Sequence, residues 1–439
     1  MNNVLSLNNL LSYFNISTNA IGSSRWWTNL AKSEAPFIKV QQDGYCKVLF
    51  LWQDPEGDQN ASLINSVILN VNGITHHNTW QPQCLERYQN SDVWFVCLTI
   101  IDQWRGSYSF IPIDQNQSPQ INEQKSDGSR EAQRSWWLSI VKQQCADPLN
   151  KAPEVVSGWG MSSPLHLPNA PSELGWYEWD QGTLNNLPIA NNVQVNWTAE
   201  ELDNQRQCTI FSTSSSSAPL VILLDGEKWS ADTGTFSVLQ YLTNINKISP
   251  AHYLLIPSVN NQTRWRELSC YEPFWQSLIE NLLPQVKDRL LKSNQSITEY
   301  LVAGQSLGGL SALYAGAYFS DYFSKVISLS GSFWWPEIER MQDFDTYKLN
   351  NRRWDKTLPK NSLADRVSNS RVTVTDLEVY QTVGMAETQL CIYNDMHYKV
   401  FKKNGAKVTY QKVQGGHDWL SWRSSLISGL VTLLPAQSS

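Results

Sequence analysis

The stretch ITEYLVAGQSLGGLSALYAGAYF, residues Ile297–Phe319, decides the fold of this chain. It opens with an apolar run at residues 300–303, turns through GQSLGG at residues 304–309, and continues with small and apolar residues. A buried strand, a G-x-S-x-G turn and a helix together hold a serine hydroxyl clear of a sheet. The sequence therefore predicts Ser306 as a nucleophile at a strand-to-helix elbow.

Glycines stand on both sides of this serine. Side chains at Gly304 and Gly308 are expected to collide with neighbouring backbone. Gly309, with Ala312 and Ala315, is expected to let the helix lie close to the sheet. The alternative is an ordinary glycine-rich turn, because three fixed positions in five also arise by chance. The strand before the turn and the helix after it favour the nucleophile.

The chain around the elbow alternates apolar runs with helical stretches. The runs are residues 220–224, 253–256, 300–303, 325–329, 374–382 and 407–413. Continuous apolar strands separated by helices predict a mostly parallel sheet with helices on both faces. With the serine elbow, this pattern predicts an α/β-hydrolase domain over residues 191–439. Residues 192–197 and 206–212 are expected to be its first strands.

The first half of the chain has a different pattern. Short strand-like runs separated by turn residues, such as residues 46–52, 67–73 and 92–99, predict an N-terminal immunoglobulin-like β-sandwich over residues 1–150. The polar stretch 114–134 is predicted to be a long loop. Residues 151–190 are rich in Pro, Gly, Ser and Trp, which indicates an irregular strap that connects the two domains.

Composition limits the kind of partner. The net charge of −6 and the isoelectric point near 5.6 argue against binding to nucleic acid or to a membrane surface. The N-terminus lacks a basic segment before an apolar run, and no stretch of about 18 apolar residues occurs, so a cytoplasmic protein is expected. The seven scattered cysteines predict reduced thiols rather than a disulfide framework or a zinc site. The pattern indicates neither a metal nor a cofactor, and it leaves the oligomeric state open.

A serine hydroxyl needs a general base within hydrogen-bond reach. His417 follows the last predicted strand and the pair Gly415-Gly416, and it satisfies the chain order of nucleophile, acid and base in this fold. The alternative for His417 is an ordinary surface-loop histidine. His252 is expected to be structural and His397 to be solvated. The sequence therefore predicts His417 as the base.

The acid is expected after the strand at residues 377–382 and before the base. Glu387 lies three residues past Gly384, which ends that strand, and it is predicted to fix the tautomer and stabilise the charge of the imidazole. Asp395 lies further into the next helix and is expected to be solvated. Asp418 is adjacent to the base in sequence, which is a poor position from which to orient its own neighbour.

An oxyanion hole needs two backbone N–H groups. One is expected from Leu307, directly after the nucleophile. The other is expected from Glu227, in the loop DGEKW at residues 225–229. Asp225 is predicted to brace this loop, although it could be a plain turn residue.

At these residues the chain resembles the enterochelin (ferric enterobactin) esterases, the Fes family, over nearly its whole length. The catalytic half carries LLDG at 223–226 with Trp229, GQSLGGLSALYAG at 304–316, SGSFWW at 330–335 and GGHD at 415–418 with Trp422-Arg423. The front half carries NGIT at 72–75, DVW at 92–94, WRGSY at 104–108 and ADPLN at 146–150. The front-half motifs are the more specific, because many esterases share the elbow but few carry this sandwich before it.

The resemblance implies a cytoplasmic esterase that hydrolyses the trilactone backbone of ferric enterobactin to dihydroxybenzoyl-serine units and thereby permits iron release. Iron then enters only as part of the substrate, and Ser306, His417 and Glu387 carry over as nucleophile, base and acid. A ferric tri-catecholate is an aromatic trianion, so arginine and tryptophan side chains are its natural contacts. The candidates in loops near the predicted site are Arg264, Arg266, Arg423, Trp229, Trp334 and Trp335.

Several alternatives stay open. Each of these arginines could be solvated and each tryptophan could belong to the core, and Arg264 could instead pair with Glu267. Two other functions are possible: a feruloyl-type carbohydrate esterase with a sugar-binding sandwich, and a non-catalytic binder of ferric siderophores. The first would be secreted, whereas a binder would have no need of the complete elbow and the Gly-Gly-His segment.

Overall fold

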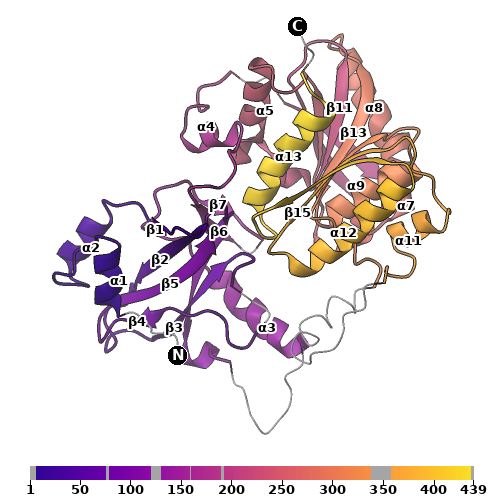
Figure 1. Cartoon of the computed structure of the whole chain (residues 1–439). Helices are drawn as coiled ribbons and strands as arrows, with labels where there is room; N and C mark the ends of the chain where they lie inside the picture. Colours follow the sequence, from indigo (N-terminus) through magenta and orange to yellow (C-terminus); the bar gives the residue numbers. More distant parts are fainter. Residues whose placement is uncertain are drawn as a thin grey trace. The chain divides into compact units, whose positions relative to one another are not determined.

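The computed structural model describes residues 6–75, 79–119, 130–158, 160–188, 192–337 and 357–436. Contacts divide the chain into two units, which Figure 1 colours from indigo to yellow along the sequence. The first unit is Met1–Pro171 together with the short segment Gln414–Ser421, and the second is Ser172–Val413 together with Trp422–Ser439. A short piece near the C-terminus therefore belongs, by its contacts, to the N-terminal unit.

The first unit contains two four-stranded antiparallel sheets. One has the strand order β1-β2-β5-β4, and the other has the order β3-β6-β8-β7. The strands of the first sheet are β1 (Phe37–Val40), β2 (Tyr45–Gln53), β5 (Val93–Ile101) and β4 (Glu86–Arg87). The strands of the second are β3 (Ile64–Val71), β6 (Arg105–Asp114), β8 (Met161–His166) and β7 (Val155–Val156).

Alternation along β2 explains how these sheets are covered. Successive side chains of a strand point to opposite faces. Phe50 contacts Tyr108 of β6 with ring centroids 5.0 Å apart, so the two sheets pack face to face. Leu49 and Leu51, on either side of Phe50, pack on the other face with the helices α1 (Leu7–Tyr13) and α2 (Ser24–Leu30). The predicted sandwich is therefore present, and helices cover the outer face of one of its sheets.

The sandwich extends beyond residue 150. Strands β7 and β8 lie in the stretch that we predicted to be an irregular strap, and β8 pairs with β6 from Arg105↔His166 to Tyr108↔Ser163. Pro164 sits inside β8, and no apolar alternation marks this strand in the sequence. Its pairing with β6 makes it a strand, which residue pattern alone does not indicate. The rest of the strap contains helix α4 (Trp176–Asp180).

The second unit is built on one eight-stranded sheet with the order β16-β15-β14-β13-β11-β12-β10-β9. Its strands are β9 (Val193–Ala199), β10 (Asn204–Ser212), β11 (Ala218–Leu224), β12 (His252–Ile256), β13 (Ile297–Gln305), β14 (Lys325–Leu329), β15 (Glu378–Gly384) and β16 (Lys407–Val413). Strands β11 to β16 pair in parallel, whereas β9 and β10 are antiparallel. The predicted α/β-hydrolase domain, including its two leading strands, is confirmed.

Helices pack on both faces of this sheet (Figure 1). Neighbouring residues of β14 show this, because a Cβ on Gly316 of α9 (Leu307–Tyr318) would meet Val326, whereas one on Gly429 of α13 (Trp419–Leu433) would meet Ile327. Besides α4, the other α-helices among the described residues of this unit are α5 (Thr235–Asn244), α6 (Asn261–Leu268), α7 (Glu272–Ser277), α8 (Leu283–Leu291), α11 (Leu363–Ser368) and α12 (Thr388–Lys403).

Some predicted features lie partly outside the described residues. The predicted polar loop 114–134 includes residues 120–129, which are not described, and helix α3 (Arg130–Ile140) begins inside its predicted range. All seven cysteines are free thiols. Among the described residues, no helix is both long enough and apolar enough to cross a membrane.

Candidate active site

Ser306 occupies the turn between β13 and α9. Its backbone has φ = 58° and ψ = −120°, and a positive φ is uncommon for a residue with a side chain. Its N–H donates to the Leu329 carbonyl of the next strand at 2.8 Å, which fixes the turn against the sheet. Gln305 and Leu307 on either side are buried, whereas Ser306 is half-buried. The elbow predicted from the sequence is present.

The flanking glycines have different roles. A Cβ on Gly304 would lie 2.4 Å from the carbonyl oxygen of Gly308, so glycine is required there. A Cβ on Gly308 would meet its nearest atom, Asp225 Oδ2, at 3.4 Å, which is ordinary contact, so the predicted collision at Gly308 is wrong. Gly309 is the tighter position, because a Cβ there would lie 3.0 Å from Ser328 Oγ on β14.

The segment after β14 contacts the elbow. The N–H of Ser332 donates to the Ser306 carbonyl at 3.0 Å, and the two hydroxyl oxygens are 3.4 Å apart. The hydroxyl contact is long for an O–H···O hydrogen bond. Ser332 therefore fixes the backbone of Ser306 more firmly than its side chain.

Glu387 precedes α12, just past the end of β15. Its Oε1 accepts hydrogen bonds from the Ser330 hydroxyl at 2.6 Å and from the Gly384 N–H at 2.7 Å. The Ser330 hydroxyl also accepts from Trp422 Nε1 at 3.0 Å. Because β13, β14 and β15 are parallel neighbours, Ser306, Ser330 and Glu387 follow three adjacent strands at one edge of the sheet. Glu387 is thus held in a defined position at the edge that carries Ser306.

The other two acids considered for this role have partners of their own. Asp395 accepts from the Tyr410 hydroxyl and from Lys412 Nζ, both at 2.8 Å. It is thus half-buried in an ion pair rather than solvated as expected. Asp418 is buried, and its Oδ1 accepts from the Leu420 N–H at 2.8 Å at the start of α13.

His417 lies in the segment that contacts assign to the first unit, and the residue is half-buried. Its carbonyl accepts a hydrogen bond from Asn72 Nδ2 at 2.9 Å. His397 is not solvated as predicted. It is buried in α12, stacked on Phe333, and burial lowers its pKa to about 3. His397 is therefore a core residue.

The loop after β11 is braced by Asp225, as predicted. Asp225 has φ = 53° and accepts hydrogen bonds from Ser258 Oγ at 2.7 Å and from Gln305 Nε2 at 3.2 Å. The loop then forms a single 3₁₀ turn over Gly226–Trp229, which contains the Glu227 N–H proposed for the oxyanion hole. Leu307 is the first residue of α9, where N–H groups have no partner within the helix.

Arg264 pairs with this brace rather than with Glu267. Its Nε and Nη2 donate to the two Asp225 oxygens at 2.6 and 2.7 Å, and 23% of its side chain is exposed. Glu267 is bound instead by Arg206 at 2.6 Å. Arg266 has 47% of its side chain exposed and donates to the Leu202 carbonyl. Among the three predicted arginines, Arg266 is the most accessible.

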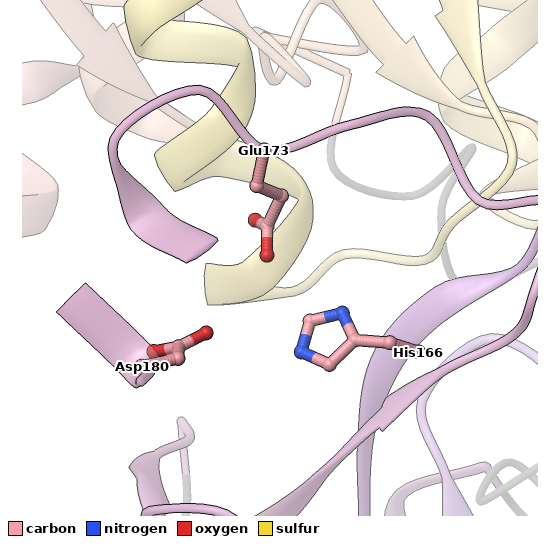
Figure 2. A group of neighbouring side chains, drawn as sticks. All are labelled: His166, Glu173 and Asp180. Carbon is pink, nitrogen blue, oxygen red and sulfur yellow. The ribbon is translucent and has the colours of Figure 1, made fainter. Parts of the chain in front are cut away.

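Arg423 has a structural role instead of the predicted substrate contact. Its guanidinium is buried and donates to both oxygens of Glu173, at 3.0 and 2.7 Å, and to both oxygens of Asp180. Figure 2 shows these carboxylates, Glu173 before α4 and Asp180 on it. Burial opposes the charge of Arg423, but the two carboxylates outweigh burial and raise its pKa. Arg423 therefore anchors the chain around α4 to α13.

The predicted tryptophans separate in the same way. Trp229 is fully buried and donates from Nε1 to Gln305 Oε1 at 3.3 Å, so it supports the turn after β11 from inside. Trp334 is buried and Trp335 half-buried, and both contact Trp265 of α6, with ring centroids 5.9 and 6.5 Å from it. Trp265 itself is 42% exposed. Trp265, Trp334 and Trp335 form an aromatic trio. Trp334 lies two residues after Ser332, which contacts the elbow.

Comparisons with known proteins agree with this architecture. Residues 47–176 match the family described as "Enterochelin esterase, N-terminal", and residues 199–433 match the family described as "Putative esterase". The "Iron(III) enterobactin esterase" of Dickeya dadantii is 36% identical over 95% of this chain and 94% of its own length. The chain belongs to the iron(III) enterobactin esterase family.

Solved structures support the family membership. The ferric enterobactin esterase of Salmonella typhimurium is 32% identical, with a TM-score of 0.79 over 93% of this chain and 98% of that one. The enterobactin esterase of Shigella flexneri, crystallised in the presence of enterobactin, is 31% identical with a TM-score of 0.77 over 94% and 98%. Membership therefore covers both units.

Sequence reasoning missed several residues of this member of the family. Ser330 and Ser332 lie in the SGSFWW motif, and Asn72 and Ser107 lie in front-half motifs. These motifs indicate the family, but they assign no function to the four residues. Trp265 carried no signal of its own. Its ring contacts come from residues about 70 positions away, and only the folded chain brings them together.

Proposed function

We propose that this chain is a serine esterase that hydrolyses the trilactone backbone of ferric enterobactin to dihydroxybenzoyl-serine units, so that iron can be released. The observation that carries the proposal is Ser306, held at positive φ between β13 and α9. It stands in a chain that matches iron(III) enterobactin esterases across both units. The relative from Shigella flexneri has also been crystallised with 2,3-dihydroxy-N-benzoyl-serine, the unit that such a reaction would produce.

The proposed reaction has two stages. Ser306 Oγ attacks a lactone carbonyl carbon while His417 accepts the hydroxyl proton. The N–H groups of Leu307 and Glu227 stabilise the oxyanion. The ring C–O bond then breaks, and His417 gives its proton to the departing serine oxygen of the substrate. In the second stage, water attacks the acyl-enzyme by the same route and restores the Ser306 hydroxyl. Glu387 orients the imidazole throughout.

The substrate contacts are aromatic and cationic. The exposed Trp265, with Trp334 and Trp335 behind it, offers ring faces to a catecholate, and Arg266 offers an accessible positive charge. The iron belongs to the substrate, and the proposed chemistry needs no cofactor of the enzyme. We further infer a cytoplasmic location, where free thiols such as these seven cysteines are common. An immunoglobulin-like assignment of the sandwich stays a prediction, supported by its two four-stranded antiparallel sheets.

The test is incubation of the purified full chain with ferric and with iron-free enterobactin, followed by chromatography of the products. Dihydroxybenzoyl-serine fragments are expected with the wild type. The Ser306→Ala variant is expected to lose at least about 1000-fold in turnover, because the nucleophile is gone. The absence of fragments, or equal amounts from both proteins, would contradict the proposal. Tight binding of ferric enterobactin without cleavage would identify a binder instead.

A further inference from the structure

The segment Gln414–Ser421 is held by the N-terminal sandwich, although β16 before it and most of α13 after it belong to the second unit. It starts beside β6, where the Arg105 N–H donates to the Gln414 carbonyl at 3.0 Å. This is a backbone hydrogen bond like those of a sheet. The loop that carries His417 is therefore fixed by residues more than 300 positions earlier in the chain.

Contacts flank His417 on both sides. Before it, Gly416 packs on Asn72, whose carbonyl oxygen would lie 2.6 Å from a Cβ on that glycine. At His417 itself, Asn72 Nδ2 donates to the backbone carbonyl at 2.9 Å. After it, Asp418 Oδ2 accepts from the N–H of Ser107 at 3.2 Å and from its hydroxyl through a short hydrogen bond. Contacts thus hold the backbone at Gly416, at His417 itself and at Asp418.

Asn72 and Ser107 act as one support. The Asn72 N–H donates to the Ser107 carbonyl at 3.1 Å, so the two residues are themselves joined. Ser107 and Asp418 are both buried, with relative exposures of 4% and 3%. A hydrogen bond from a hydroxyl to a buried carboxylate is stronger than one between neutral groups. Asp418 is shared, because its other oxygen caps α13 at the Leu420 N–H.

We propose that Asn72 and Ser107 are positioning residues for the base, and that the sandwich therefore contributes to catalysis as well as to the fold. The proposal rests on the assignment of His417 as base under the proposed function. Neither side chain reacts. Asn72 holds the His417 backbone directly, and Ser107 holds it through Asp418. A displacement of a catalytic group by about 1 Å can cost about 100-fold in rate, so the support matters even though it lies outside the chemistry.

The experiment compares Asn72→Ala, Ser107→Ala and Ser107→Thr with a matched control, Ser109→Ala. Ser109 is buried on the same strand, two residues further along, and its hydroxyl donates to Gln144 instead of to the loop. Two measurements are made on the full chain. One is kcat and KM separately with ferric enterobactin, and the other is amide hydrogen exchange of the peptide that covers residues 414–421.

Asn72→Ala and Ser107→Ala are expected to lower kcat by about 10-fold to 100-fold with KM within about twofold, and to speed exchange in this peptide. Ser107→Thr keeps a hydroxyl donor and is expected to restore kcat to within about threefold of the wild type. Ser109→Ala is expected to leave both readouts unchanged. A merely structural role would affect all the alanine variants alike, the Ser109→Ala control included, and would not single out kcat and this peptide.

The proposal is overturned if Asn72→Ala and Ser107→Ala keep kcat within about twofold and leave exchange of the 414–421 peptide unchanged. This failure differs from failure of the proposed function, in which the wild type itself does not cleave ferric enterobactin beyond the Ser306→Ala level. Hydrogen exchange still decides in that case. Faster exchange would support the holding of the loop, and unchanged exchange would overturn it. Two variants that act at different points of the loop guard against one that does not fold.

Discussion

The elbow around Ser306 and the loop around His417 each present one side chain, and they are held by different interactions. At the elbow, positive φ at Ser306, a glycine at 304 and a hydrogen bond to the Leu329 carbonyl all lie within the second unit. At the loop, Asn72 and Ser107 of the first unit donate hydrogen bonds to His417 and Asp418. One position is built from neighbouring strands of a single sheet, and the other from residues remote in sequence.

The difference shows where each position is vulnerable. The elbow depends on close packing of the backbone, so a methyl group added at Gly304 should displace the start of α9. The loop is held by a few hydrogen bonds and by the contact of Gly416 with Asn72. Loss of these contacts should leave the sheets and helices in place and should displace chiefly His417. Variants of the elbow should therefore affect stability and rate together, whereas variants of the loop should affect chiefly the rate.

Glu387→Gln tests the carboxylate on the elbow side. If Glu387 orients the imidazole, kcat should fall by about 10,000-fold, because an amide favours the wrong tautomer. Steady-state kinetics with ferric enterobactin measures this. The matched control is Asp395→Asn, which alters a carboxylate bound to Tyr410 and Lys412 and should change kcat by less than about threefold. A loss below about tenfold in Glu387→Gln would point to a catalytic dyad of Ser306 and His417.

Gly304→Ala tests the close-packing of the elbow. The new Cβ would lie 2.4 Å from the Gly308 carbonyl oxygen, so the start of α9 must move away. We expect kcat to fall by about 100-fold or more, together with a lower melting temperature. Gly308→Ala is the paired variant, because its Cβ meets only ordinary contacts, and it should stay within about threefold of the wild type. Equal losses in both variants would show that the two glycines are not distinguished as described.

Gly416→Ala makes the same chemical change in the loop around His417. Its Cβ would lie 2.6 Å from the Asn72 carbonyl oxygen, so the loop should shift while the sheet and helices remain. We expect kcat to fall by about tenfold with a melting temperature within about 2 °C of the wild type, measured by kinetics and circular dichroism. Gly158→Ala is the control, because a Cβ there meets nothing within 4 Å. A large drop in the melting temperature of Gly416→Ala would contradict the expected difference between the loop and the elbow.

Trp265→Ala should have the smallest effect, because it removes ring area beside the site and leaves the elbow and the loop intact. An aromatic contact contributes about 0.5–1.5 kcal/mol, so KM should rise by about 2-fold to 10-fold with kcat nearly unchanged. The control is Tyr177→Ala, because Tyr177 is also an exposed aromatic residue but lies on a different helix, α4. An unchanged KM in Trp265→Ala would remove the aromatic trio from the proposed substrate contacts.

The residues that sequence reasoning placed correctly share one property. The geometry of Ser306 follows from its immediate neighbours, since a strand, a glycine turn and a helix are encoded side by side. The position of Asp225 is also local to the end of β11, whereas its partner Arg264 lies on helix α6. By contrast, Arg423 and Trp229 were assigned to the substrate, but both are buried. Burial is decided by what packs over a residue, and a sequence window does not contain that information.

By itself, the sequence determined the two-part architecture, the serine elbow and the candidate base and acid, because strand-helix alternation and glycine placement are local patterns. Tertiary structure alone decided that β8 joins the sandwich. It also decided that Arg423 donates hydrogen bonds to Glu173 and Asp180. The ring contacts of Trp265 with Trp334 and Trp335 likewise exist only in the folded chain. Tertiary structure also decided that Asn72 and Ser107 hold the His417 loop. The physical reason is that these contacts join residues far apart in the chain, and their energy depends on distances that exist only after folding.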